Sequence, residues 1–466
     1  MSSAVNPATS TATSTATSTA ERPVRRGLLH QRDFRLIWIG QTTSRLGSTI
    51  SSVALPLVAV SVLDASPLLV GALAAASWLP WLLVGLPAGA WVDRLPRRPV
   101  MLACDLVSSA LLLSVPVAAW CGALTLAHLL TVAFLTGVAS VFFQTAYQAY
   151  LPSLLAREDL AEGNAKLLGT DSAATVAGPG LAGLITQASA AAMGLLADAA
   201  SFLVSAACLL GIRARESGDE RRKAGARGTA GPPGTARRRR TIGLRREIGE
   251  GLRFVGRDPY LRVLTVAGAV SNLALTGQQT ILVVFLVRVV HVAPGAVGYL
   301  VAAGSAGGML GAFAATRLSR HFGTARALVL CQLCTAPFAL LTPLAAQGWR
   351  LSLVVLGGSV VTAGVVAGNV IRGGFRQAYV PSHLLGRAVV SMQFLNFGAI
   401  PAGALAAGAL GDTLGAGPTM WLTAGGVALA GLLLLIGPLH RQTDLPTCPA
   451  GRDDEYALER RYHVIK

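Results

Sequence analysis

The stretch Gly85-Leu-Pro-Ala-Gly-Ala-Trp-Val-Asp-Arg-Leu-Pro-Arg-Arg98 joins two long apolar runs through a short basic turn. Its charged residues are Asp93, Arg94, Arg97 and Arg98. Short loops rich in Lys and Arg between membrane helices stay on the cytoplasmic side. The stretch therefore predicts two membrane-spanning helices that turn inside the cell. A plain stop-transfer turn, the alternative, needs the arginines but neither Gly89 nor Asp93.

The composition is typical of an integral membrane protein. Of the 466 residues, 53% are apolar and only 13% are charged, and the mean hydropathy is +0.57. A soluble chain of this length needs a larger charged surface. The 52 glycines suit close contact between membrane helices, because small residues let two backbones approach each other.

The formal net charge of +17 raises the question of a nucleic-acid partner. However, the Lys and Arg residues lie mainly in short segments between apolar runs and in one central loop. That distribution indicates positive charge retained inside the cell and attracted to anionic lipids of the bilayer. We therefore expect a membrane partner and no nucleic acid.

Twelve apolar runs are long enough to cross a bilayer, which takes about 20 residues. The runs are 35–63, 67–92, 99–120, 126–150, 164–187, 191–212, 261–289, 295–317, 325–346, 351–376, 388–411 and 418–438. If the N-terminus is inside, the loops that also fall inside hold most of the Lys and Arg, as the positive-inside rule requires. We expect an all-α membrane protein of twelve transmembrane helices with both termini in the cytoplasm.

The polar segments predict the domain organisation. Residues 28–212 and 261–440 are expected to form two six-helix halves joined by a cytoplasmic linker at 213–260. Residues 1–27, rich in Ala, Thr and Ser, are expected to be a disordered cytoplasmic tail, and 441–466 a second cytoplasmic tail. Within the linker, 242–255 has apolar residues at helical spacing and favours a helix on the inner membrane surface; a solvated tether is the alternative.

The two halves repeat each other. Gln148-Ala-Tyr-Leu-Pro-Ser153 recurs as Gln377-Ala-Tyr-Val-Pro-Ser382, each at the end of the fourth run of its half. The opening basic turn also recurs, with Thr316 in place of the acid. Two parallel repeats of six helices place a substrate site between them, near the middle of the membrane.

No pattern of catalysis or metal binding stands out. The seven histidines are isolated, and Cys331 and Cys334 form a CxxC pair inside an apolar run without a second pair nearby. We therefore expect a protein that is not an enzyme and that holds no metal and no cofactor.

The pattern Gly89-x-x-x-Asp93-Arg94-x-x-Arg97-Arg98 resembles the loop between helices 2 and 3 of the major facilitator superfamily of secondary transporters, with Pro96 where that family usually has Gly. Gly178-Pro-Gly-Leu-Ala-Gly183 resembles the Gly-Pro-rich fifth helix of its drug/proton antiporters. Stretches at 146–155, 162–164, 197–202 and 247–254 look like its bacterial branch of macrolide and siderophore exporters. The resemblance covers roughly residues 28–440.

This resemblance implies alternating-access efflux, driven by protons, of an amphipathic small molecule such as a drug, a macrolide-like metabolite or a siderophore. It implies a monomer in the cytoplasmic membrane of a bacterium. Two alternatives stay open: an uptake transporter or lipid flippase on the same fold, and a non-transporting membrane sensor. In relatives the acid matching Asp93 meets the inner end of helix 11, expected here near Ala388. That contact implies a gating loop formed by Gly89, Asp93, Arg94, Arg97 and Arg98.

The resemblance also sorts the polar residues inside the membrane, since helices 1, 4, 7 and 10 of this superfamily line the cavity and helices 2, 5, 8 and 11 form its walls. The candidates for the substrate path are Gln144, Asn272, Gln278, Gln279, Arg372, Gln393 and Asn396. For each amide an interhelical hydrogen bond is the alternative. Arg372 equally suits a side chain that reaches toward the inner interface. Gly178, Pro179 and Gly183 are expected to kink the fifth helix and allow a close crossing.

Asp171 and Arg45 are the expected coupling pair. They lie about 10 and 15 Å from the inner ends of their helices at 1.5 Å per residue, and a long Arg side chain bridges that difference. Charges this deep in a membrane are usually paired or functional. A fixed structural bridge, or two separate groups that each face water, is the alternative. Asp105 and Asp198, on helices expected outside the path, are expected to be structural.

Overall fold

The computed structural model describes residues 28–92, 95–155, 159–188, 191–213 and 253–446. Within these residues the chain is helical and has no strand. Each of the twelve expected ranges contains a helix, and nine of the described helices are long and apolar enough to cross a membrane. The expected N-terminal tail, most of the linker, most of the expected C-terminal tail, and Asp93 and Arg94 of the gating loop lie outside the described residues.

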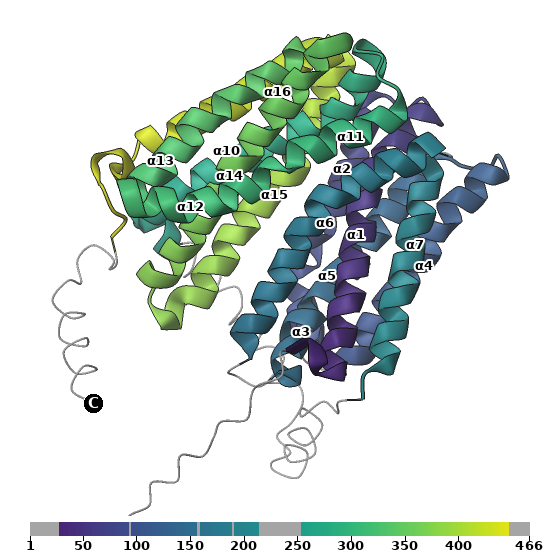
Figure 1. The fold of residues 1–466 in the computed structure, drawn as a ribbon, viewed down its shortest axis with the longest axis horizontal. Coiled ribbons are helices and arrows are strands. Elements are labelled where there is room, and N and C mark those ends of the chain that lie inside the picture. Colours follow the sequence, from purple (N-terminus) through teal and green to yellow (C-terminus); the bar gives the residue numbers. More distant parts are fainter. Residues whose placement is uncertain (1–27, 93–94, 156–158, 189–190, 214–252, 447–466) are drawn as a thin grey trace, which may run out of the picture.

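The first bundle is built around α1. Its elements are η1 (Leu28–His30), α1 (Arg32–Ser61), α2 (Pro67–Leu83), α3 (Gly85–Val92), α4 (Arg97–Trp120), α5 (Leu126–Leu154), α6 (Leu160–Ala188) and α7 (Ala191–Gly211). Helix α1 packs along α6 and α7, and α4 packs against α5 and α7 (Figure 1). Leu57 and Val58 of α1 are completely buried in this core.

The second bundle follows the linker. Its elements are α10 (Pro259–Val284), η2 (Phe285–Val289), α11 (Pro294–Ser305), α12 (Gly307–Phe322), α13 (Thr324–Thr335), η3 (Ala336–Leu344), η4 (Gly348–Leu351), α14 (Ser352–Tyr379), α15 (Ser382–Leu414), α16 (Ala416–Leu432), η5 (Leu433–Leu435) and η6 (Pro438–Arg441). Helix α10 packs against α15 and α16, and α14 packs against α12 and η3.

Some expected helix boundaries differ from the observed ones, and proline explains two of the differences. The second run divides into α2 and α3 because Pro87 has no N–H to donate to the carbonyl of Leu83. The ninth run ends in the 3₁₀ segment η3, which contains Pro337 and Pro343. Helix α15 begins at Ser382, six residues before the expected start at 388.

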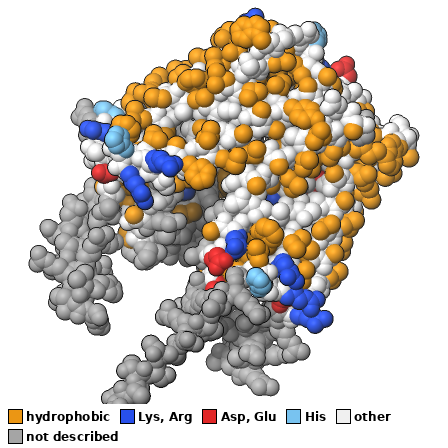
Figure 2. Space-filling view, in the orientation of Figure 1, with side chains coloured by type: hydrophobic (Ala, Val, Ile, Leu, Met, Phe, Trp, Pro, Cys, Tyr) orange, Lys and Arg blue, Asp and Glu red, His pale blue; other side chains and the backbone are white. Residues whose placement is uncertain are grey.

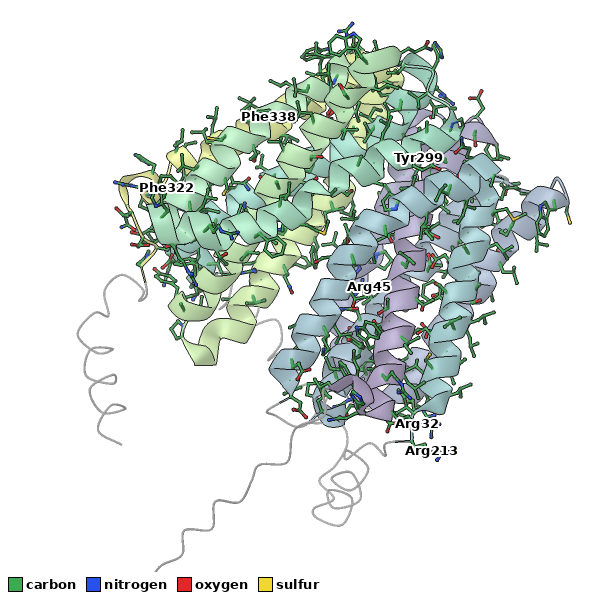
Figure 3. All side chains as sticks on the ribbon, in the orientation of Figure 1. Arg32, Arg45, Arg213, Tyr299, Phe322 and Phe338 are labelled. Carbon is green, nitrogen blue, oxygen red and sulfur yellow. The ribbon has the colours of Figure 1, made fainter. Side chains whose placement is uncertain are left out.

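The two bundles meet at one end and separate at the other (Figure 1). Arg32 and Arg213 lie at the separated end of the first bundle (Figure 3). On the face shown in Figure 2, hydrophobic side chains are spread over the flanks of both bundles, while charged ones gather toward the ends. Leu310 and Phe313 of α12, for example, are 70% and 68% exposed. Such a surface is stable only against lipid, so the bundles sit side by side in a membrane.

Polar contacts hold the joined end together. The carboxylate of Asp412 in α15 accepts hydrogen bonds from Ser66 Oγ at 3.1 Å and from the N–H of Leu68 at 3.2 Å. The guanidinium of Arg288 in η2 forms an ion pair with Asp64, in the loop between α1 and α2. These contacts link the first bundle to the second at the end where they meet.

Candidate transport pathway

A cavity of about 350 Å³ lies between the two bundles. The first bundle contributes Thr49, Ser52, Val53, Thr175 and Pro179, and residues of α10, α11, η3 and α14 supply the rest of the lining. On α10 the lining residues are Leu275, Gln278, Gln279, Leu282 and Val283, whose spacing places them on one helical face. Two amides thus project into a mostly apolar cavity whose described lining carries no charged side chain.

A second pocket of about 300 Å³ lies within the first bundle and is far more polar. Its lining comes from α1, α5 and α6 and consists of Gln41, Thr42, Arg45, Gln144, Tyr147, Gln148, Asn164, Leu167, Thr170 and Asp171. It therefore brings together three of the residues singled out from the sequence: Arg45, Gln144 and Asp171.

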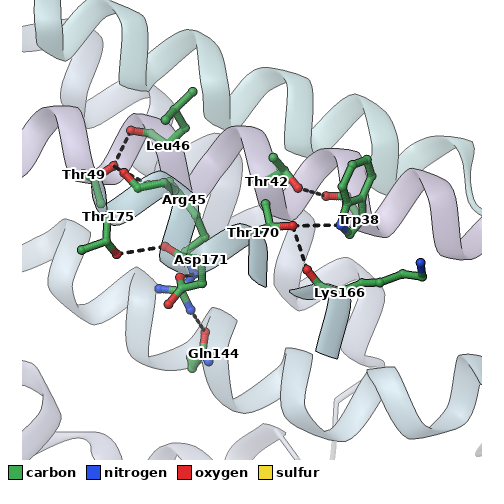
Figure 4. Close-up of polar contacts among 11 residues, drawn as sticks. Trp38, Thr42, Arg45, Leu46, Thr49, Gln144, Lys166, Thr170, Asp171 and Thr175 are labelled. Carbon is green, nitrogen blue, oxygen red and sulfur yellow. Dashed lines mark hydrogen bonds and ion pairs between the residues drawn. The ribbon is translucent and has the colours of Figure 1, made fainter. Parts of the chain in front are cut away.

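Arg45 sits between two partners in this polar pocket (Figure 4). Its Nε lies 3.4 Å from Asp171 Oδ1, and its Nη2 donates to Gln144 Oε1 at 2.9 Å. The Arg45 and Asp171 side chains are 45% and 53% exposed, so the pair faces the space between the bundles. Exposed pairs of this kind contribute only about 0.2–1 kcal/mol. The arrangement can therefore be made and broken at small cost.

The polar pocket and the central cavity are consecutive along two helices. Thr49 of α1 and Thr175 of α6 follow Arg45 and Asp171 by four residues, which is about one turn, and both line the cavity. Thr49 Oγ1 donates to the carbonyls of Arg45 and Ala174, both at 3.1 Å, and Thr175 Oγ1 donates to that of Asp171 at 2.9 Å (Figure 4). The ion pair thus lies about one helical turn from the lining of the central cavity.

The other amides expected on the path have different surroundings. Asn272 Nδ2 of α10 donates to the carbonyl of Asn396 in α15 at 3.2 Å, and Asn396 Nδ2 donates to the carbonyl of Met392 at 2.7 Å. The Asn272 side chain therefore makes the interhelical contact that the sequence left open as the alternative, while the Asn396 side chain bonds within its own helix. Gln393 is exposed and lines neither of the two pockets described above.

Arg372 lies on the side of α14 that faces α13. A Cβ added at Gly368 would be 2.7 Å from Gln332 Nε2 and 3.2 Å from Arg372 Nη2, so both side chains border the same spot. Arg372 Nε is buried and has no hydrogen-bond partner among the described residues. Arg372 lines neither the central cavity nor the polar pocket.

The glycines and proline of the fifth run make close crossings on both sides of α6. A Cβ at Gly178 would overlap the side chain of Thr49 in α1. A Cβ at Gly183 would lie 2.7 Å from the carbonyl oxygen of Gly295 in α11, and one at Gly298 would lie 2.6 Å from that of Pro179. Only glycine allows the backbones of α6 and α11 to approach this closely, so the motif forms part of the joined end.

Two arginines of the basic turn are anchored to helix ends. Arg97 Nη1 donates to the carbonyl of Ala149 at 2.9 Å, and Arg98 donates to the carbonyls of Leu209 and Leu210, both at 2.8 Å. The last carbonyls of α7 have no partner within the helix, and they attract positive charge. Gly89, by contrast, faces open space, since nothing lies within 4 Å of a Cβ added there.

Sequence reasoning missed the polar contacts of the joined end. Asp64, Arg288 and Asp412 were available as a signal, because they are charged residues in loops and helix ends that are otherwise poor in charge. Their partners, however, lie more than 200 positions away in the chain. Within the described residues no group of three or more His, Cys, Asp or Glu side chains is placed to hold a metal ion.

Comparison with known proteins places the chain in context. A family model described as Major Facilitator Superfamily matches residues 37–404. The multidrug efflux pump Tap of Mycolicibacterium fortuitum is 28% identical over 427 residues, which cover 89% of this chain and 98% of that protein. Tap of Mycobacterium tuberculosis (strain ATCC 25618 / H37Rv) is 28% identical over 422 residues, covering 88% of this chain and 94% of that protein.

Solved structures share the fold at low sequence identity. A bacterial homologue of the iron transporter ferroportin in its inward-facing state has a TM-score of 0.67 at 17% identity, covering 88% of this chain and 99% of that one. Its outward-facing state has a TM-score of 0.54 at 16% identity, covering 88% and 100%. The nucleoside transporter NupG has a TM-score of 0.68 at 10% identity, covering 88% and 100%.

Proposed function

Because the chain belongs to the major facilitator superfamily, we propose that it is a secondary transporter that exports amphipathic small molecules such as drugs, and that proton entry drives this export. The relatives named multidrug efflux pump Tap support efflux as the direction of transport. Macrolide-like metabolites and siderophores belong to the same candidate class of substrate. Uptake, lipid flipping and ligand sensing without transport are the competing outcomes.

The observation that carries this proposal is the cavity between the two bundles. Its apolar walls suit the hydrophobic body of a substrate, while Gln278, Gln279 and the hydroxyls of Thr49 and Ser52 offer hydrogen bonds. Because both bundles supply lining residues, a rocking movement of one bundle against the other would change the cavity's access and its shape together. Gln144 lines the polar pocket next to this cavity, and we propose that it forms part of the substrate path.

The basic residues suggest how the protein sits in its membrane. Arg32, Arg97, Arg98 and Arg213 all belong to the separated end, and the positive-inside rule assigns such an end to the cytoplasm. The structure would then be the inward-facing state, in agreement with the higher TM-score to the inward-facing ferroportin homologue. We assign the protein to the bacterial cytoplasmic membrane as a monomer, with both termini inside and its basic loops near anionic lipids.

Arg45 and Asp171 are the proposed coupling pair. In the inward-facing state they form an ion pair that water can reach. Protonation of Asp171 would remove its negative charge and release Arg45, leaving Gln144 as the remaining partner of the guanidinium. Both residues lie one turn from the lining of the central cavity, so a change in their pairing can alter the part of the cavity that binds the substrate.

The test is transport by the purified full-length protein in proteoliposomes of known orientation. Ethidium, an amphipathic fluorescent probe, serves as the initial substrate, followed by a panel of macrolides and tetracyclines. An imposed proton gradient should drive accumulation in the direction that corresponds to export, and a protonophore should abolish it. The same panel should show reduced drug susceptibility in a pump-deficient bacterial host that expresses the protein.

Each competing function has its own result in this assay. Net movement in the opposite direction would establish uptake, and movement of a fluorescent phospholipid between leaflets would establish flipping. Saturable binding of the probe without any flux, with or without a gradient, would indicate that the protein is a membrane sensor and not a transporter. Uphill export that persists with the protonophore would remove proton coupling while retaining efflux.

A further inference from the structure

Buried polar side chains line the contact between α1, α4 and α7, away from the polar pocket. This seam consists of Ser44, Asp105, Ser108, Ser109, Asp198, Ser201 and Ser205, each less than a tenth exposed. It contains two acids, and among the described residues no Lys or Arg is less than a tenth exposed. The transport pathway described above uses neither acid.

Asp105 has no partner for its charge. It is 1% exposed, and neither carboxyl oxygen has a hydrogen-bond donor among the described residues. Ser205 of α7 faces it, is completely buried, and also has an unpartnered hydroxyl. Arg98, two turns earlier on α4, directs its N–H groups to carbonyls at the end of α7. An ionised carboxylate in this place is strongly unfavourable even if Ser205 Oγ donates to it, because no positive charge compensates it. A protonated carboxyl carries no charge and can itself donate to Ser205 Oγ.

Asp198 is the second acid of the seam. It is 2% exposed, accepts a hydrogen bond from Ser201 Oγ at 3.1 Å, and lies beside Ser51 of α1. Opposite these groups stands Gly47, where an added Cβ would overlap both Asp198 Oδ1 and Ser201 Oγ. Since a single extra carbon atom does not fit on this side of Asp198, a hydrated metal ion does not fit there either. A proton needs no such space.

Of the other titratable groups on the surrounding helices, Cys104 is next to Asp105 in the chain, interacts with its charge and lies near the Phe143 backbone. Arg45, Asp171 and Tyr147 line the polar pocket, Cys208 packs on Gly40, His128 bonds to Ser114, and Lys166 pairs with Glu162. Among the described residues, the local partners of the two acids are therefore serine hydroxyls. Ser201, which bonds to Asp198, and Ser205, which faces Asp105, lie one turn apart on the same face of α7.

We propose that Asp105 and Asp198 form a proton-binding site inside the first bundle, with the hydroxyls of Ser205 and Ser201 beside them. Binding adds one proton to a carboxylate oxygen and cancels a buried negative charge. Helix α1 links this site to the polar pocket, because Gly47 packs on Asp198 and Arg45, two residues earlier, pairs with Asp171. The use of this proton in export rests on the proposed function, but its binding does not.

Infrared difference spectroscopy on the full-length protein in liposomes tests the site directly, since a protonated carboxyl has its own C=O stretching band. Spectra are recorded during a pH titration for wild type, Asp105→Asn, Asp198→Asn and the double variant. We expect a titrating band that each single variant reduces and the double variant reduces further. Asp412→Asn, which changes an acid that bonds across the joined end, is the matched control and should leave this difference band in place.

Asp105→Glu serves as a second variant in case Asp105→Asn fails to fold. It keeps the carboxyl group, so it should shift the band rather than remove it. Identical bands in wild type, Asp105→Asn and Asp198→Asn, or an unshifted band in Asp105→Glu, would overturn the proposal. So would loss of the band on adding NaCl but not choline chloride, because the seam would then hold sodium. Ethidium transport is measured on the same liposomes: a titrating band without transport would refute the proposed function and leave the proton site standing.

Discussion

The guanidinium of Arg288 binds the carboxylate of Asp64 and the carbonyl of Ala65, and so ties η2 of the second bundle to the first loop of the first bundle. Both ends of this contact have unusual backbone geometry. Arg288 lies on a π-helical turn, and Asp64 has a φ of +47°, in the left-handed region that non-glycine residues rarely occupy. Such irregular turns are frequent where a helix end serves a function.

Arg288→Gln should shift the protein away from the conformation described here, proposed to be inward-facing, because it removes a contact that joins the two bundles at the end where they meet. Asp64 is almost fully exposed, so the pair is worth about 0.2–1 kcal/mol, a population change of up to about fivefold. Distances between spin labels on the outer ends of the two bundles measure the shift. Arg350→Gln is the control, since Arg350 is exposed and makes no described contact between the bundles. Equal distance distributions for both variants would show that the contact between Arg288 and Asp64 does not stabilise this conformation.

Asp171→Asn should abolish gradient-driven export while sparing substrate binding and downhill exchange, because the variant cannot take up the proton. Glu162→Gln is a matched control on the same helix, since Glu162 forms an exposed ion pair with Lys166 at 3.4 Å. Loss of expression that is rescued by also neutralising Arg45 would indicate a structural bridge instead. Full uphill export by Asp171→Asn would transfer the coupling role to the Asp105–Asp198 seam.

Asp93→Asn should keep expression normal but shift the population toward the inward-facing state and slow transport. A carboxylate near a helix N-terminus gains roughly 0.3–1 kcal/mol, and up to ~2 when partly buried. The N-terminus of α15 at Ser382 is the expected partner once the inner ends close. Gly89→Leu should act in the same direction, because its side chain would occupy space that is open in the inward-facing state. Wild-type transport rates in both variants would leave the loop a topological role only.

Gly183→Ala should loosen the joined end. Its Cβ would come within 2.7 Å of the Gly295 carbonyl oxygen, so α6 and α11 must move apart. We expect faster labelling of a cysteine placed at Tyr299, a residue that contacts Gln187 at this crossing, when a membrane-impermeant thiol reagent is added outside. Gly169→Ala on the same helix is the control, because nothing lies within 4 Å of its added Cβ. Labelling no faster than that of the control contradicts a tight crossing.

The orientation in the membrane can be tested with single cysteines in a background without the six native ones. Cysteines at Ser217 and Thr443 should resist a membrane-impermeant thiol reagent in intact cells, since both positions are expected inside. A variant that retains only Cys121 provides the positive control, because this exposed residue caps the end of α4 that points away from Arg97. Labelling of Ser217→Cys or Thr443→Cys from outside would show that the proposed orientation in the membrane is wrong.

The sequence alone determined the membrane environment, the helical architecture and the pairing of two halves. Helix length, apolar content and the position of Lys and Arg act locally, since lipid forces each backbone segment to satisfy its own hydrogen bonds. Because of that constraint, each of the twelve apolar runs can be predicted as a helix without knowing its neighbours. The repeat at Gln148 and Gln377 then added the relation between the halves.

Only the tertiary structure decided which polar residues meet. Arg45 and Asp171 form the expected pair. The Asn272 side chain instead bonds to the backbone of α15, the Asn396 side chain bonds within α15, and Arg372 turns toward α13. The sequence could not choose among these outcomes, because an amide or an arginine inside a membrane suits a cavity and a helix contact equally well. The buried acids Asp105 and Asp198 differ from Asp171 for the same reason: the rotation and packing of a helix, which follow from its neighbours, decide whether a carboxylate faces water or serine hydroxyls.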